Sequence, residues 1–139
     1  MEPRITVLTL AVQDLERSVA FYRDGLGWPT EGIVGQEIEN GAVAFFDLAN
    51  GMKLALWPQE FLQNDTGLRI DRANNPTGFT LGHNVDSADE VAAVLDHAMR
   101  AGATLVQAPR RRSWGGVTAY FQDVDGHLWE VVYNPDLAG

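Results

Sequence analysis

The sequence contains no cysteine among its 139 residues, which excludes disulfide bonds, thiol nucleophiles and cysteine-based zinc sites. Basic residues are also few: ten Lys and Arg stand against 19 Asp and Glu, giving a formal net charge of −9. Such a chain repels a phosphate backbone unless its basic residues gather, so we expect no nucleic-acid partner. One basic cluster occurs, at Arg110–Arg112, and is interpreted as a solvated turn, with an anion or partner contact as the alternative.

Long apolar runs are missing as well. No run approaches the roughly 18 residues that a membrane-spanning helix needs, so we expect no membrane partner. The apolar segment 5–12 is followed by Asp14 without the small-residue cleavage site of a signal peptide, which indicates a strand. Together with the lack of cysteine, this favours a cytoplasmic protein.

The first part of the chain predicts the order strand, helix, strand, strand. Asp14 precedes apolar positions at helical spacing, and Gly25 and Gly27 follow them as helix-stop signals. The expected elements are a strand at 5–12, a helix at 15–26, and strands at 42–48 and 52–57 around the Asn50–Gly51 turn, with an extra strand near 32–38 left open.

The later part predicts the same order. Ser87 and Glu90 form a capping box at the start of a helix, and Gly102 lies where the helix should end. The expected elements are a strand at 79–85, a helix at 88–101, a short strand at 105–108, and strands at 117–121 and 127–133 around the Asp125–Gly126 turn.

The two parts align as an internal repeat. Tyr120 stands 75 residues after Phe45, and each precedes a turn signal by five residues. We therefore predict one domain, 1–139, built from module one at 1–57, an inter-module segment at 58–77 that packs down as a short helix, and module two at 78–139. In each module a helix covers one face of the sheet, so the other face must pair with a similar face or hold a ligand.

Two motifs carry a resemblance to a known family. The segment Val12–Gly27, with Asp14-Leu15-Glu16-Arg17-Ser18 and Phe21-Tyr22, and the ending Asp123-x-Asp125-Gly126-His127-x-Trp129-Glu130 resemble the vicinal oxygen chelate superfamily. This superfamily includes glyoxalase I, extradiol dioxygenases, fosfomycin-resistance enzymes and bleomycin-resistance proteins. The resemblance implies an α+β fold of two βαβββ modules, whose curved mixed sheets form a glyoxalase-like cup with helices outside.

The resemblance also implies four metal-ligand positions, on the first and last strands of each module. Here those positions hold Val7, Ala55, Thr80 and Glu130. Valine and alanine cannot coordinate a metal, and catalytic sites usually take three or more protein ligands. We therefore expect no metal and no cofactor.

Of the four implied metal-ligand positions, Glu130 has the side chain that can still act chemically. We expect it to serve as a general base or as a counter-ion for a cationic small molecule. Strand alternation places Trp57 on the cup side with Ala55, as a ligand wall or as packing against the inter-module segment. Trp114 closes the cup mouth or anchors its own loop. The predicted ligand-binding residues are Val7, Ala55, Trp57, Thr80, Trp114 and Glu130.

The three histidines show no metal-ligand spacing. Alternation along 79–85 turns His83 toward the helix, as a core or edge histidine. His97 and His127 are expected to be exposed.

Three functions remain open. The first is metal-independent binding of a small, cationic or aromatic molecule by a homodimer, as the bleomycin-resistance branch implies. The second is a lyase or dioxygenase-type enzyme with Glu130 as general base. The third is an interaction module whose sheets bury each other across a dimer. Fold resemblance alone does not choose among them.

Overall fold

The computed structural model describes residues 1–70 and 78–136. The chain divides into two compact units, Met1–Asp71 and Arg72–Gly139, and each is described by itself. Among the described residues, no helix is long and apolar enough to cross a membrane.

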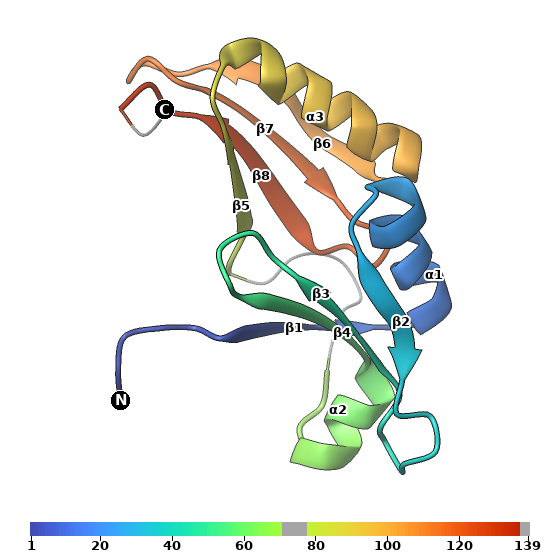
Figure 1. Cartoon of the computed structure of the whole chain (residues 1–139). Helices are drawn as coiled ribbons and strands as arrows, with labels where there is room; N and C mark the ends of the chain where they lie inside the picture. Colours follow the sequence, from blue (N-terminus) through green and yellow to red (C-terminus); the bar gives the residue numbers. More distant parts are fainter. Residues whose placement is uncertain (71–77, 137–139) are drawn as a thin grey trace. The chain divides into compact units, whose positions relative to one another are not determined.

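The first unit is a four-stranded mixed sheet with a helix on one face (Figure 1). The strand order is β1-β4-β3-β2, in which β1 and β4 are parallel and the other pairs are antiparallel. Its elements are β1 (Val7–Val12), α1 (Leu15–Ala20) continued by the π-helical turn η1 (Phe21–Gly25), β2 (Thr30–Val34), β3 (Val43–Asp47), β4 (Lys53–Pro58) and α2 (Gln59–Thr66).

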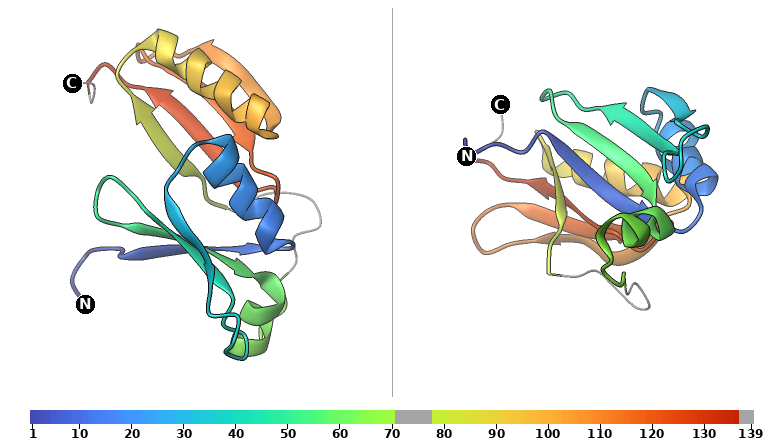
Figure 2. Two further views of the ribbon diagram at one scale, coloured as in Figure 1. Left: turned by 45° about the vertical axis from the view of Figure 1, so that its right-hand side comes forward. Right: turned by 90° about the horizontal axis from the view of Figure 1, so that it is seen from below.

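The second unit repeats this plan, with strand order β5-β8-β7-β6 and the parallel pair again between its first and last strands. In both views of Figure 2, α3 lies along one face of this sheet. Its elements are β5 (Leu81–Val85), α3 (Ala88–Ala101), β6 (Thr104–Arg111), β7 (Val117–Gln122) and β8 (Leu128–Tyr133). The predicted α+β fold and the repeat of βαβββ order are confirmed.

Helix caps form where the sequence predicted them. The Asp14 carboxylate accepts the N–H of Arg17 at 3.1 Å, and the Ser87 hydroxyl accepts the N–H of Glu90 at 3.3 Å. The Glu90 carboxylate reaches back to the N–H of Asp86, one residue earlier than a capping box requires. Each cap satisfies backbone donors that the first helical turn leaves unpaired.

Apolar side chains fill the space between each helix and its sheet. In the first unit, Tyr22 packs against Phe46, with ring centroids 5.9 Å apart, and both are fully buried. In the second unit, Val91 and Leu95 of α3 and Val131 of β8 are buried. These contacts fix which face of each sheet its helix covers, and leave the opposite face for other roles.

Several predicted boundaries were wrong. β6 extends to Arg111 rather than ending near residue 108, so Arg110 and Arg111 belong to a strand and not to a turn. β5 begins at Leu81, so Thr80 precedes it. The extra strand that was left open exists as β2, and the inter-module segment forms α2 as predicted. The remainder of that segment, 71–77, lies outside the described residues, as does 137–139 of module two.

Both central hairpins use the same three-residue loop, which ends in a left-handed glycine. Gly51 has φ +82° and Gly126 has φ +87°, a region that favours glycine. The loops are closed by Leu48 N–H to Met52 O at 2.8 Å and Asp123 N–H to His127 O at 3.0 Å. This type I turn with a following bulge sets the register of β3 on β4 and of β7 on β8.

The second hairpin has an additional side-chain anchor. Asp123, only 3% exposed, accepts the backbone N–H groups of Asp125 and His127 through Oδ1, both at 2.9 Å. Its Oδ2 lies 3.0 Å from Nδ1 of His127. The repeat-equivalent position in the first unit is Leu48, which has no side-chain acceptor.

We predict that Asp123→Ala lowers the free energy of unfolding by about 2–3 kcal/mol, because two backbone N–H groups lose their acceptor. Urea denaturation measures the change. As a control, Asp96→Ala on the exposed side of α3 should stay within about 0.5 kcal/mol of the wild type. Equal losses in the two variants would refute the anchoring role of Asp123.

Candidate functional site

Glu130 lies on the face of its sheet opposite α3. Its register partner on β7 is Tyr120, and its partner on the parallel strand β5 is Gly82. The flanking residues Phe121 and Trp129 alternate to the other face, where they are buried and stacked with centroids 6.0 Å apart. Glu130 itself is half-buried.

Four polar residues on this face form what we call the Glu130 network: Arg112, Thr118, Tyr120 and Glu130. The Tyr120 hydroxyl donates a hydrogen bond to Oε2 of Glu130. Nε of Arg112 donates to the Thr118 hydroxyl at 2.8 Å, and Thr118 is 2% exposed. The carboxylate is thus held through one oxygen, while Oε1 makes no hydrogen bond to any residue that the structure describes.

The Glu130 network changes the acidity of the Tyr120 hydroxyl. The hydrogen bond to the Glu130 carboxylate is the largest cause that raises the pKa of Tyr120 above its ordinary value of 10.0, and burial adds to it. The Arg112 guanidinium opposes this shift. Tyr120 therefore remains a protonated donor throughout the neutral range, and Glu130 keeps a fixed partner.

The equivalent face of the first unit is apolar at the same positions. Phe45 of β3 pairs with Ala55 of β4, at the positions equivalent to Tyr120 and Glu130 in the second unit. One backbone plan therefore carries an aromatic–alanine pair in one unit and a hydrogen-bonded phenol–carboxylate pair in the other.

The predicted residues of the first unit lie in different settings. Val7 begins β1 and is 40% exposed, whereas Ala55 is buried at 2% exposure. The Trp57 indole donates to the Asn40 carbonyl at 3.0 Å, and the Asn40 side chain accepts from Asn64 of α2 at 3.2 Å. Trp57 is therefore tied to the loop before β3 and, through Asn40, to α2. Its role as a ligand wall stays a prediction.

The predicted residues of the second unit come from different segments of the chain. Thr80 is exposed just before β5. Trp114 is 49% exposed in the loop between β6 and β7, and its ring covers Gly116, where an added Cβ would come within 1.9 Å of it. Of the predicted set, only Glu130 belongs to a hydrogen-bonded cluster of side chains in the part of the chain that is described. The ligand roles of Thr80 and Trp114 stay predictions.

Two predictions about single side chains were wrong. His127 is not exposed: its side chain is 13% exposed, because it folds onto Asp123 within the hairpin loop. Arg112 does open the turn between β6 and β7, where the Gly115 N–H donates to its carbonyl, but its side chain is half-buried and bonded to Thr118 instead of being solvated. His83 lies on the edge strand β5 and is exposed there, and His97 is exposed as predicted.

Sequence reasoning missed Tyr120 and Arg112 as site residues. A two-residue turn at Asp125–Gly126 would place Val131 opposite Tyr120, whereas the three-residue loop with a bulge places Glu130 there. The turn glycines mark both hairpins in the sequence. The strand register, however, depends on how many residues the loop contains. Arg112 has no such signal, because it reaches the face from beyond the end of β6.

The donor set does not fit the metal centre that the resemblance implies. The four ligand positions hold Val7, Ala55, Thr80 and Glu130, and Oε2 of Glu130 already accepts from Tyr120. Within 1–70 and 78–136, no group of three or more His, Cys, Asp or Glu side chains is arranged to hold a metal ion. Glu130 is the one carboxylate at these four positions.

The repeated βαβββ module defines the class of glyoxalase-like folds, and comparisons with known proteins agree. Residues 4–131 match the model of the Glyoxalase/Bleomycin resistance protein/Dioxygenase superfamily. A glyoxalase-related enzyme from Fulvimarina pelagi is 34% identical, with a TM-score of 0.80 over 96% of this chain and 89% of that chain. The chain therefore belongs to the glyoxalase/bleomycin resistance/dioxygenase superfamily.

Two further relatives are more distant. A glyoxalase/bleomycin resistance protein/dioxygenase from Nocardioides is 26% identical, with a TM-score of 0.76 over 96% of this chain and 84% of that chain. The metallothiol transferase FosB of Lysinibacillus sphaericus is 29% identical over 129 residues, covering 91% of this chain and 79% of that protein.

We predict that Tyr120 ionises above pH 10.0 and that Glu130→Gln moves its pKa down toward that value, because the carboxylate that accepts its proton is gone. The phenolate absorbance of each protein, minus that of the same protein carrying Tyr120→Phe, isolates this titration. Since the folded pKa is raised, the stabilisation is complete below the unfolded pKa of about 10 and is lost as pH rises through the folded pKa.

Asp96→Asn, which removes a carboxylate from the exposed side of α3, should leave the Tyr120 titration unchanged. An unaltered titration in Glu130→Gln would mean that Tyr120 and Glu130 do not share the hydrogen bond in solution.

Proposed function

We propose that this protein binds a small organic molecule without a metal ion, on the sheet face that carries the Glu130 network. The observation that carries the proposal is the half-buried Glu130 carboxylate, which Tyr120 holds through Oε2 and whose Oε1 accepts from no residue within 1–70 and 78–136. Such a carboxylate can accept a hydrogen bond from a ligand ammonium, and charge-assisted bonds of this kind are the stronger ones.

Charge favours a cationic group on the ligand. The net charge of −9 attracts cations at long range, although this attraction is screened by salt. Arg112 on the same face offers a second, opposite charge that suits an acceptor on the ligand. A ligand that carries an ammonium group and an acceptor therefore matches this face better than an anion alone.

The test uses four compounds that share one ring and differ in charge: benzylammonium, phenylalanine, benzyl alcohol and benzoate. We predict that the two ammonium compounds raise the melting temperature most, since a ligand at ten times its Kd stabilises the folded state by about 1.4 kcal/mol. Glu130→Gln should weaken their binding about five- to tenfold, as measured by calorimetric titration.

Asp96→Asn is the matched control, because it removes one negative charge from the opposite side of the same unit. It should leave the affinities within about twofold of the wild type. If Glu130→Gln binds the ammonium compounds as tightly as the wild type does, Glu130 is not their counter-ion.

If the protein is instead an enzyme, Oε1 of Glu130 has a different role. As a general base, Oε1 would remove a proton from carbon next to a carbonyl group. Deuterium exchange into dihydroxyacetone, followed by NMR, tests this: the binding proposal expects only the buffer rate. Faster exchange that disappears in Glu130→Gln would favour a lyase-type enzyme.

The homodimer implied by the bleomycin-resistance resemblance is a further proposal. Sedimentation equilibrium at several protein concentrations measures it directly, and a monomer at all concentrations would reject it.

A further inference from the structure

The sequence contains two Asn-Gly pairs, Asn40-Gly41 and Asn50-Gly51, and both lie in loops of the first unit. Asparagine followed by glycine is prone to spontaneous deamidation, because glycine has no side chain to keep its peptide nitrogen away from the asparagine amide. In a folded chain the reaction depends on whether these two groups can meet. The structure holds the two pairs in opposite ways.

Asn40 is held by its side chain and by its backbone. Its Oδ1 accepts from Asn64 at 3.2 Å, and its carbonyl accepts from the Trp57 indole at 3.0 Å. Gly41 lies in a crowded loop, where an added Cβ would come within 2.5 Å of the Gly35 carbonyl oxygen. Ring closure at Asn40 must therefore disturb two hydrogen bonds and move closely packed backbone.

Asn50 is exposed in the loop between β3 and β4. Its Oδ1 accepts the N–H of Met52 at 3.3 Å, so the side-chain amide folds back over the Gly51 peptide that lies between them. Its Nδ2 makes no hydrogen bond to any residue within 1–70 and 78–136. A Cβ added at Gly51 would meet nothing within 4 Å. The amide nitrogen can therefore leave without breaking a bond to the described protein.

One hydrogen bond is common to both pairs. The Gly41 N–H donates to the Ile38 carbonyl at 2.9 Å, and the Gly51 N–H donates to the Leu48 carbonyl at 3.1 Å. This bond must open before either glycine nitrogen can react, so it slows both reactions. The difference between the two pairs comes from the side-chain amide and from the space around the glycine.

The Met52 N–H also favours the reaction at Asn50. When the Gly51 nitrogen forms a bond to Cγ of Asn50, negative charge develops on Oδ1, and a backbone donor at that oxygen stabilises it. Gly51 gives up its amide proton, the Cγ–Nδ2 bond breaks and ammonia leaves, which produces a cyclic succinimide. Water then opens the ring at either carbonyl, so the products are aspartate and isoaspartate.

We propose that Asn50 is a modification site, at which the folded protein deamidates through a succinimide while Asn40 is protected. The aspartate product fits the loop, because the equivalent loop of the second unit carries Asp125 immediately before its glycine. The isoaspartate product does not fit, because its main chain gains a carbon atom in a loop whose length sets the register. The site does not depend on the function proposed for Glu130.

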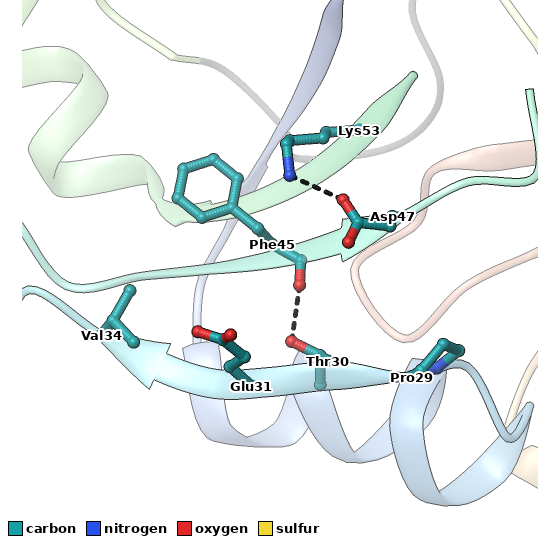
Figure 3. A pocket seen from close by; sticks show the side chains of 7 residues that line it. All are labelled: Pro29, Thr30, Glu31, Val34, Phe45, Asp47 and Lys53. Atoms are coloured by element: carbon teal, nitrogen blue, oxygen red, sulfur yellow. Dashed lines mark hydrogen bonds and ion pairs between the residues drawn. The ribbon is translucent and has the colours of Figure 1, made fainter. Parts of the chain in front are cut away.

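The strands beside this loop show what the change of register affects. Asp47 and Lys53 are register partners on β3 and β4, and Nζ of Lys53 lies 2.6 Å from Oδ1 of Asp47 (Figure 3). Together with Phe45 they contribute to the lining of a groove of about 560 Å³. An additional main-chain atom between the two strands misaligns this ion pair and the groove wall that it forms.

The test warms the purified full chain in neutral buffer and follows both asparagines by mass spectrometry. One tryptic peptide, 24–53, contains both residues, so their deamidation is compared within a single molecule. We expect Asn50 to lose its amide at least about tenfold faster than Asn40, the factor that the hydrogen bonds holding Asn40 correspond to. In urea, where the fold holds neither residue, the two rates should agree within about twofold.

Three results would overturn the proposal. They are equal rates in the folded chain, faster loss at Asn40, and an Asn50 amide that persists in the folded chain but is lost in urea. As a control for the assignment, Asn50→Gln should stop deamidation at this position, because glutamine forms the larger ring slowly, and should leave the rate at Asn40 unchanged.

The effect on register is tested with the two products. Asn50→Asp reproduces the aspartate product and should unfold at the same urea concentration as the wild type. The isoaspartate form is separated by chromatography and identified by its methylation with an isoaspartyl carboxyl methyltransferase. It should unfold at a lower urea concentration and show shifted amide resonances at Asp47 and Lys53. An isoaspartate form that matches Asn50→Asp in both measurements would overturn the effect on register.

Discussion

The left-handed glycine at the end of each hairpin loop is the constraint on which the functional faces depend. Gly51 and Gly126 close three-residue loops, and these loops fix the pairing of the two central strands in each unit. Because side chains alternate, a slip of one residue would send Glu130 toward the α3 core and Trp129 to the opposite face. The carboxylate meets Tyr120 only because the loop has this length.

One backbone plan therefore supports two kinds of surface. In the second unit the central pair is a phenol and a carboxylate, supported by Arg112 and Thr118. In the first unit the same pair is Phe45 and Ala55. The helix-covered faces keep their apolar packing, so the opposite faces can differ without loss of the core.

Much of the fold was predictable because its signals are local. Asp14 and Ser87 cap helices through hydrogen bonds to residues three positions away, and turn glycines mark the hairpins. The site was less predictable because its contacts depend on register. Tyr120 and Glu130 are ten residues apart and meet only through the loop.

The parallel pairs bear on the order in which each unit assembles. Val7 pairs with Lys53, 46 residues later, and Leu81 pairs with Trp129, 48 residues later. The strand made first in each unit is thus paired only after the last strand has left the ribosome, whereas the hairpins and helices form from neighbouring residues. Closing so long a loop slows folding and leaves an apolar strand unpaired meanwhile. Newly made β1 is therefore the segment of the first unit most exposed to wrong pairing and to capture by chaperones during synthesis.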